Sequence, residues 1–179
     1  MKWVILDRDG VINEDSDAYI KSPEEWEAIP GSLEAIELLT RHGYRLVVIT
    51  NQSGIARGYF NEEVLAKIHA KMVREVAALG GRIDAIYHCP HGPEDGCECR
   101  KPKAGLYRRM AEDFAVNLQG VPAIGDSFRD LEAAQSVGAA PMLVATGKGM
   151  GTLTLHPNLD LPIFSNLYEA ALAILHDDD

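Results

Sequence analysis

The chain has 179 residues and a formal net charge of −10 at pH 7. Its length suits a single domain over residues 1–179, and its 46% apolar and 25% charged content is typical of a globular protein. The negative charge argues against nucleic acids and anionic membranes as main partners. The longest apolar runs, WVIL and LVVI, are too short to cross a bilayer, and residues 1–6 leave no room for a signal peptide. We therefore expect a cytoplasmic protein.

Short apolar segments alternate along the chain with amphipathic ones. The apolar segments are rich in β-branched residues and predict strands covered on both faces at 3–7, 45–50, 83–88, 121–125 and 141–145. The amphipathic segments predict helices at 32–42, 61–79, 104–116, 128–137 and 166–175. This alternation predicts an α/β fold with a doubly wound, Rossmann-like, mostly parallel sheet and helices on both faces. The aspartates at 177–179 oppose the dipole of the last helix, so we expect that tail to fray.

Polar residues gather where the predicted strands end, which is where open parallel sheets bind ligands. Asp7 and Asp9 follow the first strand, and Thr50 ends the second. Lys101 follows the third strand after a loop, and Asp126 ends the fourth. Each of these pieces alone is more often a turn or a helix cap. Their presence at four successive strand ends predicts one shared site.

The residue types at these strand ends suit phosphoryl transfer. Asp7 and Asp9 lie two residues apart and would repel each other unless a cation joined them. Asp7 could attack a phosphoryl group, with Mg²⁺ held by Asp7, the backbone carbonyl of Asp9 and Asp126. Lys101 and Thr50 would stabilise the transferred group. Asp9 would protonate the leaving alkoxide and later deprotonate the attacking water, a role for which we expect a raised pKa.

Four motifs, DRDGVIN, TNQSGIARGYF, CRKP and GDSFRD, resemble the haloacid dehalogenase superfamily of phosphatases. More narrowly, they resemble its branch of D-glycero-D-manno-heptose 1,7-bisphosphate 7-phosphatases and histidinol-phosphate phosphatases. The resemblance implies Mg²⁺-dependent hydrolysis through a phospho-aspartate and the same roles for the strand-end residues. It implies a small phosphorylated sugar as substrate, namely the 7-phosphate of a heptose bisphosphate used in lipopolysaccharide synthesis. Histidinol phosphate is the alternative substrate.

The three cysteines of the chain lie in one loop, at about 89–99. With one histidine they offer four zinc ligands, namely Cys89, His91, Cys97 and Cys99. Three thiolates and an imidazole match a closed, structural Zn²⁺ site, whereas the alternative is a loop of free thiols. Zinc would fix Cys99 and thereby Arg100 and Lys101, which follow it directly.

The chain between Asp9 and the helix near Ser32 is too short for a separate cap domain, so we expect an open cleft. Polar side chains that could bind a polyol substrate are Asn51, Gln52 and Ser53, and the resemblance implies Asp15 and Tyr19 as well. Arg100 could hold a second phosphate or a carboxylate-like group. Asp130 is interpreted as a favourable charge in the first turn of its helix, and 147–151 as a flexible loop beside the cleft.

Two other classes of protein remain open from the sequence. A phosphoacceptor signalling domain also carries an acidic cluster, but it has no use for a proton-transferring Asp9. A zinc-stabilised interaction module would tolerate Asp7→Asn without any change. We expect a monomer because no large apolar surface stripe stands out. The scattered histidines, His69 and His88 among them, are assigned no chemistry.

Overall fold

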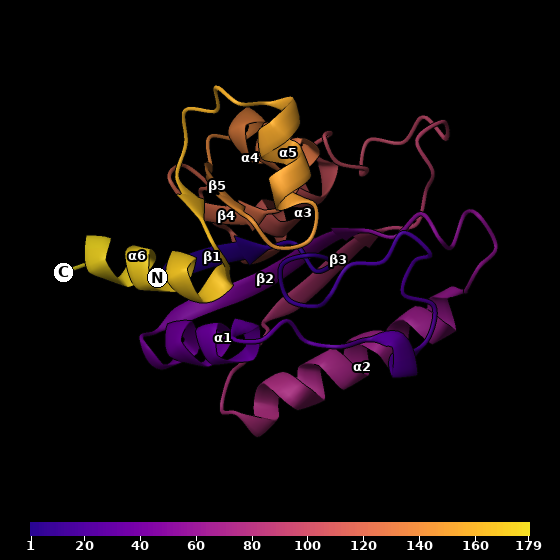
Figure 1. Cartoon of the computed structure of the whole chain (residues 1–179), viewed down its shortest axis with the longest axis horizontal. Helices are drawn as coiled ribbons and strands as arrows, with labels where there is room; N and C mark the ends of the chain where they lie inside the picture. Colours follow the sequence, from indigo (N-terminus) through magenta and orange to yellow (C-terminus); the bar gives the residue numbers. More distant parts are fainter.

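The computed structural model describes residues 1–179 and has a six-stranded parallel sheet at its centre (Figure 1). The strands are β1 (Lys2–Leu6), β2 (Tyr44–Asn51), β3 (Ala85–Cys89), β4 (Pro122–Gly125), β5 (Ala140–Val144) and β6 (Ile163–Phe164). Their order is β3-β2-β1-β4-β5-β6, and every neighbouring pair is parallel. The order reverses beside β1, so the carboxyl end of this strand lies at the position where doubly wound sheets bind ligands. The predicted fold class is confirmed.

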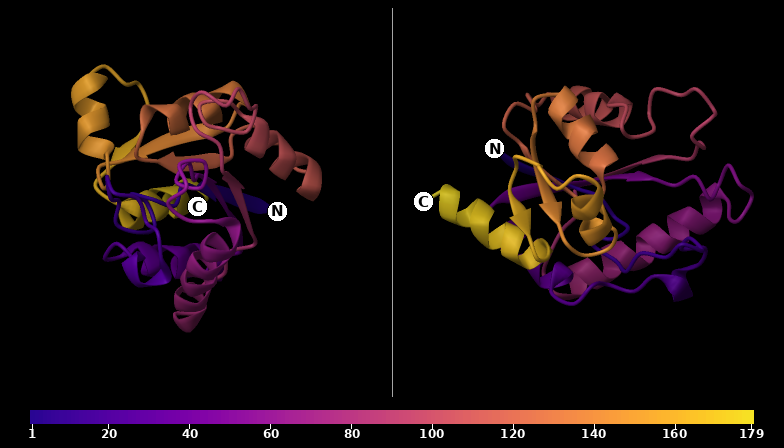
Figure 2. Two further views of the ribbon diagram at one scale, coloured as in Figure 1. Left: turned by 90° about the vertical axis from the view of Figure 1, so that its right-hand side faces the viewer. Right: turned by 45° about the horizontal axis from the view of Figure 1, so that its top comes forward.

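Helices cover both faces of the sheet (Figures 1 and 2). They are α1 (Ser32–Arg41), α2 (Glu62–Ala78), α3 (Gly105–Phe114), α4 (Phe128–Ser136), α5 (Gly149–Leu155) and α6 (Leu167–Asp177), with a 3₁₀ turn, η1 (Pro23–Glu25). α1, α2 and α6 share one apolar core with the sheet, and α3 and α4 share the other. None of these helices combines the length and the apolar character that a bilayer crossing requires.

The packing of β1 explains why the strands appear in the sequence as continuous apolar runs. Val4 and Leu6 belong to the core under α1, α2 and α6, whereas Trp3 and Ile5 belong to the core under α3 and α4. Successive side chains of a strand point to opposite faces, so a strand that is covered twice must be apolar at every position. Each such side chain contributes about 1.5–3 kcal/mol when it is fully buried. Because these side chains are held in the two cores, β1 ends at Leu6 and the acidic residues begin directly after it, at the edge of the sheet.

Among the elements that were not predicted are α5 and β6. The segment 147–151, expected to be a flexible loop, instead contains the start of α5 at Gly149. α5 has no side-chain N-cap bond and buries only Gly149 and Thr152, so its sequence lacks the usual helix signals. Thr152 Oγ1 donates to the backbone oxygen of Asp126 at 2.7 Å, which ties this helix to the end of β4. β6 has only two residues and is too short for a periodic pattern.

The C-terminal tail contacts the first two strands of the sheet. α6 continues to Asp177, and the next carboxylate, of Asp178, contacts the hydroxyl of Tyr44 and lies 2.9 Å from Lys2 Nζ. The fraying expected of 177–179 stays a prediction. Partners on β1 and β2 compensate for the unfavourable position of a negative charge at a helix end.

Candidate active site

A polar cleft of about 320 Å³ opens at the carboxyl ends of β1, β2 and β4. Only two of its 18 lining residues are hydrophobic. The structure brings together here all of the residues that the sequence proposed for catalysis, magnesium and substrate: Asp7, Asp9, Asp15, Tyr19, Thr50, Asn51, Gln52, Ser53, Arg100, Lys101 and Asp126. Further residues, none of them proposed as a catalytic, magnesium or substrate ligand, also line it: Ser16, Asp17, Ile20, Arg57, Arg129, Asp130 and Lys148.

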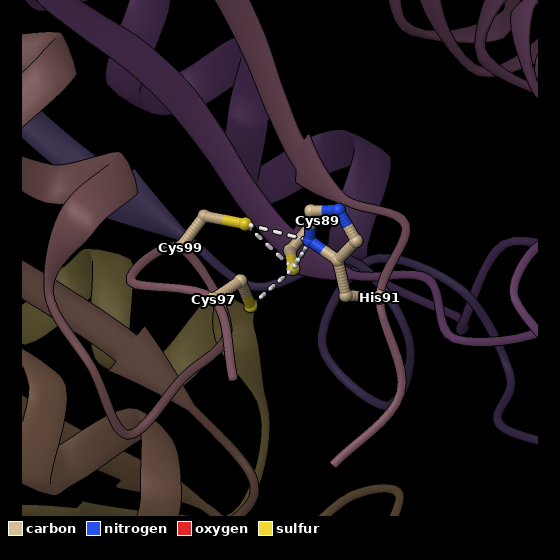
Figure 3. Close-up of side chains that lie close together, drawn as sticks. All are labelled: Cys89, His91, Cys97 and Cys99. Atoms are coloured by element: carbon tan, nitrogen blue, oxygen red, sulfur yellow. Dashed lines mark hydrogen bonds between the residues drawn. The ribbon is translucent and has the colours of Figure 1, made fainter. Parts of the chain in front are cut away.

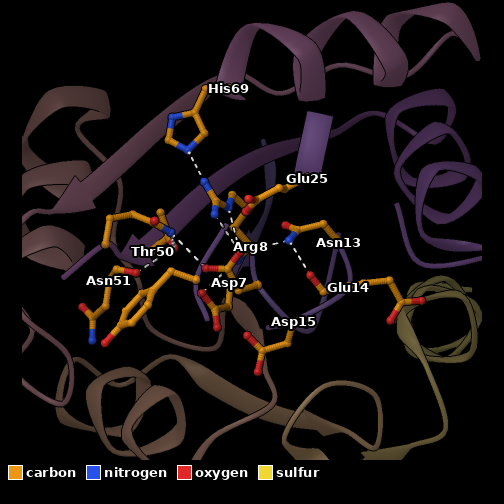
Figure 4. Close-up of polar contacts among 12 residues, drawn as sticks. Asp7, Arg8, Asn13, Glu14, Asp15, Glu25, Thr50, Asn51 and His69 are labelled. Carbon is orange, nitrogen blue, oxygen red and sulfur yellow. Dashed lines mark hydrogen bonds and ion pairs between the residues drawn. The ribbon is translucent and has the colours of Figure 1, made fainter. Parts of the chain in front are cut away.

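Asp7 and Lys101 lie at the floor of this cleft (Asp7 in Figure 4). Lys101 Nζ is 3.1 Å from Asp7 Oδ1 and 2.7 Å from Asp130 Oδ1, and it also donates to the backbone oxygen of Ile49. Burial and the nearby Asp130 raise the pKa of Asp7 well above its usual value, and Lys101 opposes that rise. Burial favours neutral Lys101, but Asp130 and Asp7 outweigh it and raise the pKa of the ammonium, which therefore stays charged.

Three carboxylates at the cleft floor could share a cation. Single oxygens of Asp7, Asp126 and Asp130 lie within 4.8 Å of one another. Burial, and then the charge of Asp130, raise the pKa of Asp126 to about 7. Three carboxylates meet here, and Lys101 pairs with two of them, Asp7 and Asp130. An all-oxygen donor set with excess negative charge fits Mg²⁺. The set includes Asp130, for which the sequence indicated only a favourable charge in the first turn of its helix.

Two glycines let the backbone approach Asp126. Gly10 and Gly147 have positive φ angles of 83° and 56°, and a Cβ atom at either position would collide with the Asp126 carboxylate. The backbone N–H of Lys148 donates to Asp126 Oδ2 at 2.8 Å. The loops after β1 and β5 are therefore packed around this carboxylate, and the flexibility of glycine is needed at both contacts.

Asp9 is held by four hydrogen bonds. Its Oδ1 accepts from Arg8 Nε at 3.0 Å, Arg8 Nη2 at 2.7 Å and Asn13 Nδ2 at 2.9 Å. Its Oδ2 accepts from Gln52 Nε2 at 3.0 Å. Burial alone would raise the pKa of Asp9, but Arg8 and these donors outweigh it and lower the pKa. The expectation of a raised pKa was wrong, because Arg8 turns back onto its neighbour, a contact that no pattern in the sequence indicates.

Several proposed substrate ligands also bond to the protein. Both ends of the Asn51 amide engage the backbone of Lys101, at 3.0 and 3.2 Å. Gln52 donates to Thr50 Oγ1 as well as to Asp9. Asp15 Oδ2 lies 2.7 Å from Lys148 Nζ, across the mouth of the cleft. These bonds orient the polar groups before any substrate arrives.

The four proposed zinc ligands lie close together beside the cleft (Figure 3). His91 Nδ1 is 3.4 Å from Cys89 Sγ and 3.3 Å from Cys99 Sγ, and Cys97 Sγ is 3.7 Å from Cys89 Sγ. All four ligand atoms lie within 4.8 Å of one another. This convergence of three thiols and one imidazole fits a tetrahedral Zn²⁺. Cys99 leads directly into the Arg100–Lys101 pair that lines the cleft.

Comparisons with known proteins agree with this geometry. A family model described as HAD-hydrolase-like matches residues 98–170, and one described as polynucleotide kinase 3 phosphatase matches residues 4–127. The fold and the acidic strand ends thus define a HAD-like phosphatase.

Proteins of similar sequence show to which group of HAD-like phosphatases the chain belongs. The chain is 59% identical over 153 residues to D-glycero-beta-D-manno-heptose-1,7-bisphosphate 7-phosphatase from Bordetella bronchiseptica, covering 86% of each chain. It is 51% identical over 172 residues to the Pseudomonas aeruginosa protein of the same name, covering 96% of this chain and 97% of that one. A crystal structure of the B. bronchiseptica D,D-heptose 1.7-bisphosphate phosphatase, complexed with magnesium and phosphate, matches with a TM-score of 0.96 and 52% identity over 99% of both chains. The chain belongs to the HAD-like family of heptose-1,7-bisphosphate 7-phosphatases.

Proposed function

We propose that this protein is a Mg²⁺-dependent phosphomonoesterase that removes the 7-phosphate of D-glycero-β-D-manno-heptose 1,7-bisphosphate. The relatives named above at 51% and 59% identity carry the β-anomer in their names, which supports this substrate over histidinol phosphate. The observation that carries the proposal is the buried contact between Asp7 and Lys101 at the end of β1, beside Asp9 and Asp126. A place in lipopolysaccharide synthesis follows from that substrate. A cytoplasmic location, a monomeric state and a single domain stay predictions.

In the proposed reaction Asp7 attacks the phosphorus atom, and the bond to the sugar oxygen breaks as Asp9 gives that oxygen a proton. Water then attacks the phospho-aspartate while Asp9 takes a proton from it, which regenerates Asp7 and releases phosphate. Lys101 and Thr50 hold the phosphoryl oxygens as charge shifts onto them. Mg²⁺, held by Asp7, Asp126 and the backbone carbonyl of Asp9, would neutralise the charge of the two anions that meet; Asp130 lies close enough to join this set.

The cleft suits a substrate with two anionic ends. Arg100 lines it together with Arg57 and Arg129, so the cleft carries positive charge as well as its acidic floor. We assign Arg100 to the second phosphate of the bisphosphate. Asp15, Tyr19, Asn51, Gln52 and Ser53 would contact the sugar or orient the groups that do. Zn²⁺ on Cys89, His91, Cys97 and Cys99 would keep Arg100 and Lys101 in place.

The test is phosphate release with Mg²⁺ from both anomers of the heptose bisphosphate, fructose bisphosphate and histidinol phosphate. We expect a preference of at least tenfold in kcat/KM for the β-anomer, which corresponds to about 1.4 kcal/mol of transition-state binding. Asp7→Asn should abolish release while the circular dichroism spectrum stays unchanged. Borohydride reduction during turnover should label Asp7. An Asp7→Asn protein with full activity would refute the enzyme proposal.

A further inference from the structure

Arg8 is a fully buried arginine between the two aspartates of the site. Asp7 and Asp9 line the cleft, whereas the Arg8 side chain is directed into the protein toward His69 of α2 (Figure 4). Its backbone oxygen accepts from the N–H groups of Val11, Ile12 and Asn13 at 3.2, 2.8 and 3.2 Å. The turn after β1 therefore fixes the position of Arg8 before its side chain makes any contact.

The guanidinium has two partners. Nε and Nη2 both donate to Oδ1 of Asp9, and Nη1 lies 3.1 Å from His69 Nε2. Because Arg8 can only donate, His69 must accept at Nε2, which requires a neutral ring with its proton on Nδ1. Burial and the charge of Arg8 lower the pKa of His69 to about 3, so the ring stays neutral. A buried cation is costly unless its donors are satisfied, and His69 supplies the acceptor that Asp9 does not.

These bonds make the two oxygens of Asp9 different. Oδ1 accepts three hydrogen bonds, two from Arg8 and one from Asn13, and has no capacity left for a proton. Oδ2 accepts one, from Gln52, and keeps free lone-pair capacity. The Asp9 side chain is 25% exposed although Arg8 is not exposed at all, so the carboxylate meets the cleft while its anchor does not.

We propose that Arg8, supported by His69, is a positioning residue that holds Asp9 Oδ1 so that Oδ2 carries the proton in both steps of the reaction. This inference rests on the proposed function, because it assigns a duty within that mechanism. In the first step Oδ2, ionised in the free protein, takes a proton from the entering phosphate monoester and gives it to the sugar oxygen as the P–O bond breaks. In the second step Oδ2 takes a proton from water as the water oxygen bonds to phosphorus and the bond to Asp7 breaks.

The inference is tested by leaving groups that differ in their need for a proton. A sugar alkoxide must be protonated as it leaves, whereas p-nitrophenolate leaves without help. We expect Arg8→Met to slow single-turnover cleavage of the heptose 7-phosphate by about 10- to 100-fold, within the usual range for general acid catalysis. The p-nitrophenolate burst from p-nitrophenyl phosphate should change by less than about threefold, because Asp7 attack does not involve Asp9. Phospho-Asp7 should then accumulate, because water activation still needs Asp9.

A matched pair of variants at His69 isolates the support given to Arg8. His69→Gln keeps an acceptor at the place of Nε2, whereas His69→Leu removes it. We expect His69→Leu to reproduce part of the loss on the heptose 7-phosphate, with KM nearly constant, and His69→Gln to restore most of it. This pair decides the question even if Arg8→Met does not fold, because both proteins keep Arg8.

The outcomes separate this inference from the proposed function. Equal slowing of both leaving groups, or no slowing of either, overturns the positioning role of Arg8. Equal rates for His69→Gln and His69→Leu overturn the support from His69. If the wild-type protein forms no phospho-Asp7 under borohydride trapping, the proposed function itself fails. If it does form that adduct and the variants behave like wild type, only the inference fails.

Discussion

Lys101 joins the end of β1 to the first turn of α4, because its Nζ lies 2.7 Å from Asp130 Oδ1 and 3.1 Å from Asp7 Oδ1. The other oxygen of Asp130 accepts from the backbone N–H and the hydroxyl of Ser127, at 3.1 and 2.8 Å. Asp130 thus caps its helix, as its position in the sequence suggested, and also serves as counter-ion to the lysine of the site. Burial raises the pKa of Asp130, but Lys101 outweighs it and lowers the pKa.

Replacement of Lys101 by methionine should leave the acidic floor without its cation. Asp7, Asp126 and Asp130 would then repel one another in a buried place, and we expect a loss of about 3 kcal/mol in the free energy of unfolding without metal. Mg²⁺ should recover part of this loss, because a cation that binds only the folded state stabilises it. Urea denaturation with and without Mg²⁺ measures both effects. Ser127→Ala is the control: it should cost about 1 kcal/mol irrespective of Mg²⁺. Equal responses of the two variants to Mg²⁺ would contradict a shared cation site.

Removal of zinc should reduce catalysis through Lys101 and leave the core intact. The backbone from Cys99 to Lys101 is held by the proposed zinc on one side and by the amide of Asn51 on the other. We expect about one zinc per chain by elemental analysis, and at least a tenfold fall in kcat after chelation or in Cys99→Ser. The far-UV circular dichroism should stay almost unchanged, since the sheet and helices lie outside the loop. A zinc-free protein with unchanged kcat would show that the loop does not position Lys101.

The fold and the catalytic strand ends could be predicted because both follow local patterns. Alternating apolar segments fix the sheet, and parallel strands carry Asp7, Thr50 and Asp126 to one edge wherever the helices lie. α5 and β6 were missed because both are short and held by tertiary contacts, such as the bond from Thr152 to Asp126. The pattern of residues within one segment does not predict such tertiary contacts.

The contacts of Arg8 show a second limit of sequence reasoning. Arg8 and His69 are 61 residues apart and come together only because α2 packs against the sheet. The histidines are scattered and have no nearby partners in the sequence, so no chemistry was assigned to His69. An arginine between two aspartates is expected to be a surface charge, but the side chain of Arg8 is fully buried. An unpaired polar residue on an otherwise apolar helix face is the one signal that could have pointed to a partner.

Loss of the Lys148 side chain should weaken substrate binding and leave the acidic floor as it is. Lys148 Nζ pairs with Asp15 across the cleft mouth, whereas its backbone N–H holds Asp126. Lys148→Met removes only the first contact. We expect KM to rise about two- to fivefold with kcat nearly constant, because the free energy that a partly exposed ion pair contributes corresponds to a change of this size. Steady-state kinetics with the heptose bisphosphate measures this, and Lys103→Met, which removes an exposed pair with Glu98, is the control. A fall in kcat with constant KM would place Lys148 in the chemical step instead.

Neutral His69 should make the protein less stable in acid. Burial, and then Arg8, lower its pKa to about 3 in the folded state, against 6.5 for an unperturbed histidine. Between these two values the unfolded chain binds a proton that the folded chain does not, so the free energy of unfolding must fall as the pH decreases from about 6.5 toward 3. His69→Gln removes this contribution and keeps the acceptor for Arg8. Urea denaturation at pH 7.5, 5.5 and 4.5 should therefore show a shallower pH dependence for His69→Gln than for wild type. The same measurement on His42→Gln, a substitution at an exposed histidine, is the control. Parallel curves for wild type and His69→Gln would mean that His69 titrates normally in the folded protein and cannot be the fixed acceptor that Arg8 requires.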